Sequence, residues 1–241
     1  MQYLTFDIET APLNFEEFSE SQQEYWLRGT NTQEEIDKKM FEMALTPMTG
    51  QVVCIGLLLN ELKDGEITTI SEGAISVDPA FTDEDSKEEI LGNGAKWYLK
   101  SEKEAILLFW KILHKYNSSK LVSFNGRNFD APFLMLRSAL HKIKPSRNLM
   151  AGTKFNYPNH IDLIDELTFF SGSAYGATKR FNFDFYARSF GLTSPKSEGV
   201  DGSMVGEFYK EGKHKEIAEY CMRDVRTTWE LFRLWNDTLN Y

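Results

Sequence analysis

The chain has 241 residues, of which 41% are hydrophobic, and this is enough to build one sizeable α/β domain. No apolar run approaches the length of a membrane span, and the N-terminus begins directly in a predicted strand without a signal peptide. We therefore expect a cytoplasmic protein with no membrane partner. Cys54 and Cys221 both fall in apolar segments and are predicted to be buried free thiols.

The first predicted strand, Tyr3–Ile8, ends at two carboxylates. Apolar residues alternate along it with polar ones, so the side chains of Asp7 and Glu9 point to the same face of a sheet. An edge strand with a solvated acidic face would give the same pattern, and a lone Asp-x-Glu more often has that explanation.

Residues 12–48 are predicted to form a helical insertion between the first two strands. The stretch from Asn14 to Met43 is charged, has a helical pattern and contains Tyr25 and Trp26. It can be interpreted as a pair of surface helices or as a cap near a functional site.

The middle of the chain has the pattern of a sheet with flanking helices. Strands are predicted at Gln51–Leu59, Glu66–Glu72, Lys120–Phe124 and around Ile161–Leu163. The first two of these would form an antiparallel meander with the N-terminal strand, and a helix from Glu102 to Tyr116 would give a crossover. The acidic residues 78–89 are predicted to be an exposed loop or a short helix.

The segment Asn125-Gly126-Arg127-Asn128-Phe129-Asp130 joins a buried strand to an apolar helix. The helix is predicted from Ala131 to Leu140, with Pro132 in its first turn, where the missing N–H costs nothing. Asp130 could accept hydrogen bonds from free amides as the N-cap, or it could bind a metal. The local sequence favours neither role over the other.

A long amphipathic helix is predicted from about Lys215 to Trp235. Its apolar face runs through Ile217, Cys221, Val225, Thr228 and Phe232. Tyr220 and Asp224 are four residues apart, so they are neighbours at the border of that face. A half-buried helix tyrosine beside a surface aspartate is the plainer explanation of this pair.

Three segments together resemble the motifs of the DEDD 3′-5′ exonucleases, in the tyrosine subclass. They are Phe-Asp-Ile-Glu-Thr, Asn-Gly-x-x-Phe-Asp-x-Pro-Phe-Leu and Tyr-x-x-x-Asp. The resemblance is strongest to the exonuclease domain of family-B DNA polymerases and to related stand-alone bacterial proteins, which residues 196–205 also resemble. It weakens only from about Pro12 to Met48. It implies an α/β fold with a ribonuclease H-like mixed sheet and flanking helices, in which residues 1–241 form a single 3′-5′ exonuclease domain.

The resemblance also implies a metal cofactor. The carboxylates of Asp7, Glu9, Asp130 and Asp224 could not all ionise in one small cleft without cations, and oxygen ligands favour two Mg²⁺ or Mn²⁺ ions. By similarity Asp7 bridges both ions. Glu9 and Asp224 serve the ion on the side of the nucleophile, and Asp130 acts on the other ion.

Tyr220 is implied to orient the attacking water rather than to act as a base, because an unperturbed phenol has a pKa of about 10. The histidine subclass would place His at position 219, which is Glu219 here, so that subclass is excluded. Thr10, Asn125 and Phe129 are implied to bind the terminal nucleotide.

The implied function is hydrolysis of phosphodiester bonds from the 3′ end of single-stranded DNA. The alternatives are a 3′-5′ exoribonuclease of the same superfamily and a non-catalytic nucleic-acid-binding module. Such modules usually lose a carboxylate, whereas all four are present here. We expect DNA rather than RNA as substrate, and the sequence names no replication or repair partner.

The net charge of −9 is unevenly distributed. Residues 1–104 carry 8 Lys and Arg against 22 Asp and Glu, a net −14, which leaves +5 for residues 105–241. The second part could therefore supply a basic track for a nucleic acid strand. Its candidates are Arg137, Lys142, Lys144, Arg147 and Lys154, with Lys179, Arg180 and Arg188 among the aromatics Phe181, Phe183, Phe185 and Tyr186. A solvated surface over a phenylalanine-rich core is the favoured explanation for Phe183 and Phe185.

Overall fold

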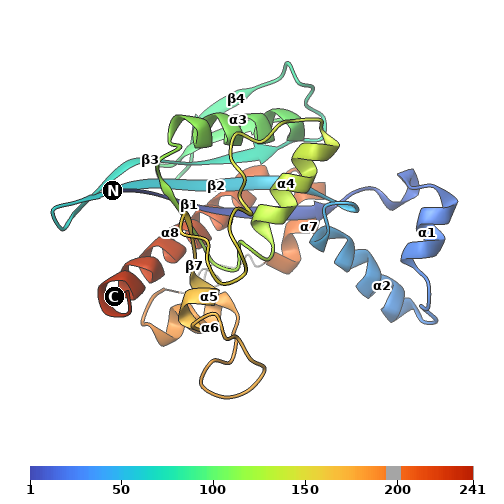
Figure 1. Cartoon of the computed structure of the whole chain (residues 1–241). Helices are drawn as coiled ribbons and strands as arrows, with labels where there is room; N and C mark the ends of the chain where they lie inside the picture. The colour runs from blue at the N-terminus through green and yellow to red at the C-terminus, as the bar shows by residue number, and fades with distance from the viewer. Residues whose placement is uncertain (194–201, 241) are drawn as a thin grey trace.

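A computed structural model describes residues 1–193 and 202–240 (Figure 1). Its centre is a seven-stranded sheet in the order β4-β5-β3-β2-β1-β6-β7. The strands are β1 (Gln2–Pro12), β2 (Gly50–Lys63), β3 (Glu66–Val77), β4 (Lys87–Ile90), β5 (Lys96–Lys100), β6 (Lys120–Ser123) and β7 (His160–Asp162). All five predicted strands are present. The short strands β4 and β5 were not predicted, and β4 lies partly in the stretch for which a loop or helix was expected.

The pairing makes this a mixed sheet. β1 with β2 and β2 with β3 are antiparallel, which confirms the predicted meander. β1 with β6 and β6 with β7 are parallel, and so is β3 with β5. The helix α3 (Glu102–Lys115) connects β5 to β6, as predicted for a crossover. The α/β class is therefore confirmed.

Helices cover both faces of the sheet (Figure 1). α3 and α4 (Asp130–Leu140) pack on the face to which Leu4, Phe6 and Ile8 of β1 point. The long helix α8 (His214–Thr238) packs on the opposite face, with Tyr3 and Ala11 of β1. The alternation of β1 thus divides its side chains between two cores, and Asp7 and Glu9 belong to the α8 side.

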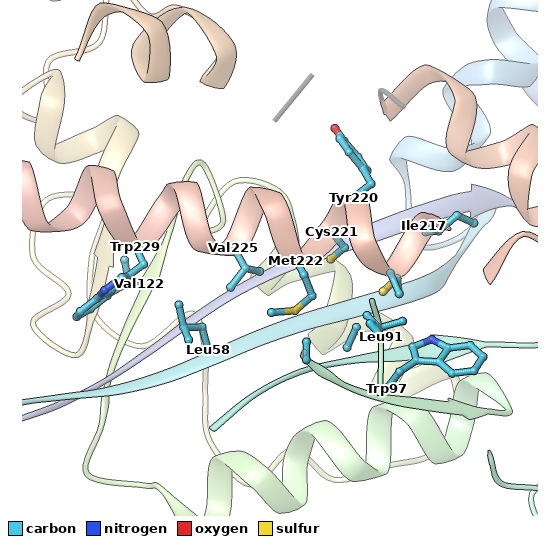
Figure 2. Close-up of a cluster of buried hydrophobic side chains, with 14 of the residues drawn as sticks. Leu58, Leu91, Trp97, Val122, Ile217, Tyr220, Cys221, Met222, Val225 and Trp229 are labelled. Carbon is cyan, nitrogen blue, oxygen red and sulfur yellow. The ribbon is translucent and has the colours of Figure 1, made fainter. Parts of the chain in front are cut away.

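The amphipathic pattern of α8 explains its position. Figure 2 shows Cys221, Met222 and Val225 pointing from α8 toward the sheet, while the ring of Tyr220 points away from it. The predicted apolar face is buried at every position. Cys54 of β2 and Cys221 are free and buried, as predicted.

The segment between β1 and β2, called the insertion here, contains helices as predicted. It contains α1 (Glu20–Trp26) and α2 (Gln33–Glu42), with short 3₁₀ turns at Phe15–Glu17 and Met43–Leu45, and it stands at one end of the sheet (Figure 1). The remaining elements are α5 (Leu163–Leu167), α6 (Phe183–Ser189), a 3₁₀ turn at Gly202–Met204 and α7 (Val205–Lys210). Within the described parts of the chain, none of these helices has the length and apolar character needed to span a bilayer. Residues 196–201 of the stretch that resembles the stand-alone exonucleases lie outside the described residues.

Candidate active site

Asp7 and Glu9 lie on an inner strand, beneath α8. β1 is flanked by β2 and β6, so the alternative of a solvated edge strand is wrong. Asp7 lies opposite Gly56 of β2, where an added Cβ would come within 2.8 Å of the Cys221 Sγ atom. Because Gly56 has no side chain, α8 packs directly on the strands beside Asp7.

Asp130 is tied to β1 by its side chain. Its Oδ1 atom accepts a hydrogen bond from the backbone N–H of Ile8 at 2.9 Å. β6 pairs with β1 only as far as Thr5, so the Asp130 carboxylate supplies an acceptor for β1 beyond the end of that strand. Asp130 is the first residue of α4 and Phe129 is at the N-cap, with no side-chain capping bond. The N-cap explanation of Asp130 is therefore wrong.

The turn before Asp130 depends on close packing. Asn125 adopts a left-handed backbone conformation with φ of 62°. The next residue, Gly126, is needed for space, since an added Cβ would lie 2.3 Å from the Ser123 Oγ atom and 3.4 Å from the Asp130 Oδ2 atom. A side chain at Gly126 would therefore clash with Ser123 at the end of β6, next to the Asp130 carboxylate.

Asp162, at the end of β7, holds this turn and was not among the predicted site residues. Its two carboxylate oxygens accept the backbone N–H groups of Asn125 at 2.7 Å and Arg127 at 2.8 Å. It also accepts the N–H of Ile164 at 3.3 Å as the N-cap of α5. An Asp between a short strand and a helix was the available signal, but nothing in the sequence connects it to residues 125–127. Burial raises the pKa of the Asp162 carboxyl to about 6.

Tyr220 and Asp224 meet on α8 as the four-residue spacing predicts. The Tyr220 hydroxyl donates a hydrogen bond to the Asp224 carboxylate. Tyr220 is buried, and an added Cβ on Gly202 would lie 3.9 Å from its hydroxyl oxygen. Burial and then the charges of Glu9 and Asp224 raise the pKa of the phenol, so it stays protonated at neutral pH.

The carboxylates of the three segments form one electrostatic group. Burial first, and then Asp130, Glu9 and Asp224, raise the pKa of Asp7 well above its ordinary value. The pKa of Glu9 is also raised by burial first, and by Asp224 next. Burial raises the pKa of Asp130 to about 7, against the opposing effect of the Ile8 N–H. Glu9 and Asp130 are buried, whereas Asp7 and Asp224 are partly exposed, so the carboxylates repel one another in a site that water reaches only in part.

Such a group fits a divalent cation. A cation bound among these oxygens would offset the repulsion that adds to the effect of burial on the pKa values of Asp7 and Glu9, and hard oxygen donors suit Mg²⁺ or Mn²⁺. Ligand atoms of Asp7, Glu9 and Cys221 lie within 4.8 Å of one another. The Cys221 thiol, however, donates to the Asp7 carbonyl oxygen at 3.7 Å and lies in the core, so we assign the cation to the carboxylates.

A cleft of about 1070 Å³ opens beside Glu9. Glu9, Thr10 and Phe129 line it, together with Gly202, Ser203 and residues of the insertion. Two predicted substrate-binding residues, Thr10 and Phe129, therefore face this cleft. The Thr10 hydroxyl also donates to the Ala44 carbonyl oxygen at 2.8 Å, which ties the insertion to β1. Asn125 does not line the cleft as far as the described residues show.

The predicted basic track is largely occupied by contacts within the protein. Arg137 is 7% exposed and pairs with the buried Glu102, its Nε atom donating to Glu102 Oε1 at 2.8 Å. Arg147 donates to the backbone carbonyl groups of Ser119 and Asn159. A role for Arg137 in binding phosphate is therefore wrong. Arg180 and Arg188 pair with Asp165 and Asp184 at the surface.

The two phenylalanines of α6 behave differently from each other. Phe183 packs against Phe124 with ring centroids 4.8 Å apart, as predicted for a core residue. Phe185 is 50% exposed and stacks on Phe181 at 4.2 Å, so the core explanation is wrong for this ring. The Lys179 Nζ atom lies 4.9 Å from the centroid of Phe181.

Residues 75–237 match a sequence family described as a predicted 3′-5′ exonuclease related to the exonuclease domain of PolB. The match covers more than half of the chain, and the chain belongs to this family. The chain is 31% identical over 145 residues to an uncharacterised protein of Methanocaldococcus jannaschii. This alignment covers 56% of this chain and 76% of that protein. The chain is 28% identical over 149 residues to a DNA polymerase of Pyrococcus glycovorans, covering 55% of this chain and 18% of the polymerase.

The fold is similar to that of the family B DNA polymerase of Pyrobaculum calidifontis. The TM-score is 0.54 at 17% identity, and the likeness covers 97% of this chain and 24% of the polymerase. It confirms the predicted ribonuclease H-like fold. The family match begins at residue 75 and leaves out Asp7 and Glu9, which the structure brings together with Asp130 and Asp224.

Proposed function

We propose that this protein is a metal-dependent 3′-5′ exonuclease that removes nucleotides from the 3′ end of single-stranded DNA, with residues 1–241 acting as one domain. The observation that carries the proposal is the convergence of three distant segments. Asp130 bonds to β1 beside Asp7, and the pKa of Asp7 responds to Glu9 and Asp224 as well. A purely structural role would not require four carboxylates, two of them buried, to lie together at this cost in repulsion.

Asp7, Glu9, Asp130 and Asp224 would hold two Mg²⁺ or Mn²⁺ ions. When bound, such ions neutralise charge on a scissile phosphate and lower the pKa of a bound water. The four carboxylates fix the positions at which this chemistry is available, since each is anchored on β1, α4 or α8.

Tyr220 has a different role. Its hydroxyl donates to Asp224, so its oxygen lone pairs remain to accept a hydrogen bond from a water molecule. Because the pKa of the phenol is raised, Tyr220 orients that water and does not take its proton.

The direction and the substrate are supported by similarity. The family description names a 3′-5′ exonuclease, and two of the relatives described above are DNA polymerases, which favours DNA over RNA. Phe129, which lines the cleft together with Glu9, offers a ring on which a terminal base could stack. A single strand reaches such a cleft without the cost of opening a duplex end.

Digestion of matched DNA and RNA strands labelled at the 5′ end tests the proposal. We expect a DNA ladder that shortens one nucleotide at a time with Mg²⁺ or Mn²⁺, and no ladder in EDTA. A faster ladder on RNA would assign the exoribonuclease activity instead. Cuts in a circular single strand would contradict an exonuclease, and no cleavage of either strand under any metal condition would favour a binding module.

A further inference from the structure

The helical insertion has an apolar surface that the rest of the protein does not cover. α1 and α2, whose residues are all described, contain no buried side chain. Tyr25 is 69% exposed, and Met48, just after the insertion's second 3₁₀ turn, is 51% exposed. Exposed apolar side chains that gather in one place, rather than singly, mark interaction sites.

These side chains surround a preformed pocket of about 560 Å³. Its walls include the aromatic rings of Phe15, Phe18, Tyr25 and Trp26 and the side chains of Met43 and Met48. The Gln23 side chain donates to the carbonyl oxygens of Phe15 and Phe18 at 3.1 and 3.0 Å, and the Trp26 indole N–H donates to that of Lys39 at 3.0 Å. These bonds fix the walls of the pocket without filling it, so a ligand would not have to order them.

The surface around the pocket is acidic. Residues 12–48 carry eight Asp and Glu against three Lys and Arg, a net −5. Exposed carboxylates alternate in sequence with the pocket residues, at Glu16, Glu17, Glu20 and Glu24. The basic residues nearby lie on aromatic rings of the pocket wall, with Arg28 over Tyr25 and Lys39 over Trp26. This charge repels the phosphates of a nucleic acid strand and attracts a cationic peptide.

We propose that this pocket binds a basic segment of a partner protein, with one or two large apolar side chains as the anchor and Lys or Arg residues flanking them. The apolar walls would receive the anchor, as in other interfaces where a few buried side chains dominate affinity, and the exposed glutamates would select the flanking charge. Phe15 lines both this pocket and the active-site cleft. The partner would therefore sit at the edge of the cleft, and its binding does not depend on the proposed exonuclease activity.

Selection of random 12-residue peptides displayed on phage, against the full chain in EDTA, tests this proposal. We expect the enriched peptides to share an aromatic or leucine anchor and a net positive charge. Their affinity should fall by about tenfold or more in the double variant Tyr25→Ser with Met48→Ser. Both side chains are largely exposed, so we expect the variant to fold normally. An unchanged thermal melting curve would show that it does.

Two further variants distinguish the contribution of the pocket to peptide affinity from that of other surface residues. Tyr175→Ser removes an 86% exposed aromatic outside the insertion and should leave peptide affinity unchanged. Glu20→Lys with Glu24→Lys should weaken binding several-fold and reduce its salt dependence. The proposal is overturned if no peptide distinguishes the wild type from the pocket variant, or if the enriched peptides are neutral or acidic. It is also overturned if oligothymidine binds with the same dependence on Tyr25 and Met48, since the occupant would then be a nucleobase.

Discussion

The Asp130 carboxylate accepts the backbone N–H of Ile8 at 2.9 Å, although 122 residues separate the two positions. This bond links the first turn of α4 to β1 between Asp7 and Glu9. Asp130 therefore has two tasks, since one oxygen supports the strand while the carboxylate as a whole belongs to the acidic site. The two tasks can be separated by substitution.

Asp130→Asn should abolish nuclease activity and keep most of the stability, because an amide oxygen can still accept the Ile8 N–H while the negative charge is lost. Asp130→Ala should abolish activity and also lower the free energy of unfolding by about 1–3 kcal/mol, since the Ile8 N–H loses its partner. Urea denaturation of both variants, beside a cleavage assay, measures the two effects. Equal stability of the two variants would contradict a structural role for this bond.

The free energy of unfolding should depend on pH because the carboxylates of the site have raised pKa values. The folded-state pKa of Asp130 is about 7, above the ordinary 3.8, so its ionisation weakens the fold above pH 7 and the penalty is relieved as pH falls through 7. Below about pH 6.5, His160 opposes this trend, because burial lowers its pKa to about 3. In EDTA we therefore expect the free energy of unfolding to fall between pH 6.5 and 8, by at most about 1.4 kcal/mol per pH unit for each titrating group.

Asp130→Asn should show a smaller fall over the same interval, because it lacks one titrating group. Millimolar Mn²⁺ should raise the melting temperature of the wild type and flatten its pH dependence, since a cation bound to the folded state holds the carboxylates ionised. Thermal melts at three pH values, with and without Mn²⁺, provide the measurement. If Mn²⁺ left the melting temperature unchanged at every pH, this result would contradict the metal site.

Arg137 should matter for stability and not for nucleic acid binding. Arg137→Met leaves Glu102 buried without its main partner, and loss of one member of a buried ion pair costs about 3–5 kcal/mol. The slope of log affinity for single-stranded DNA against log salt should stay unchanged in this variant. Lys142→Ala or Lys179→Ala should instead reduce the slope by about 1 if that lysine contacts a phosphate. A reduced slope with normal stability in Arg137→Met would contradict the buried pair.

Asp162 should act on the reaction through the turn at 125–127. In Asp162→Asn, an amide N–H₂ group replaces one of the two acceptors for the Asn125 and Arg127 amides, so we expect a loss of about 1–3 kcal/mol. Cleavage should slow because Phe129 and Asp130 shift, while Mn²⁺ still raises the melting temperature. Asp184→Asn, which pairs with the exposed Arg188 at the surface, is the matched control and should change neither quantity much. If Asp162→Asn cleaved DNA at the wild-type rate, Asp162 would have no role in the reaction.

The elements that hold the site could be predicted because their patterns are local. Each pattern lies within one continuous segment of the sequence. These patterns are the alternation along β1, the apolar face of α8 and the first turn of α4 with Pro132. The missed features of the site and of the Arg137 pair depend on contacts between distant segments. Asp130 reaches Ile8, Asp162 reaches Asn125, and Arg137 turns inward to Glu102 instead of outward to solvent. Charge counts alone could not reveal that Arg137 already had a buried partner.

Single-turnover cleavage of 5′-labelled single-stranded DNA, compared between the wild type and Asp7→Asn, tests the central claim most directly. We expect the wild type with Mg²⁺ or Mn²⁺ to shorten the strand from its 3′ end and Asp7→Asn to leave it intact. Tyr220→Phe should cleave about 10²–10⁴-fold more slowly than the wild type, as for loss of one positioned group. Cleavage by Asp7→Asn at the wild-type rate with Mg²⁺ would contradict the assignment of this site.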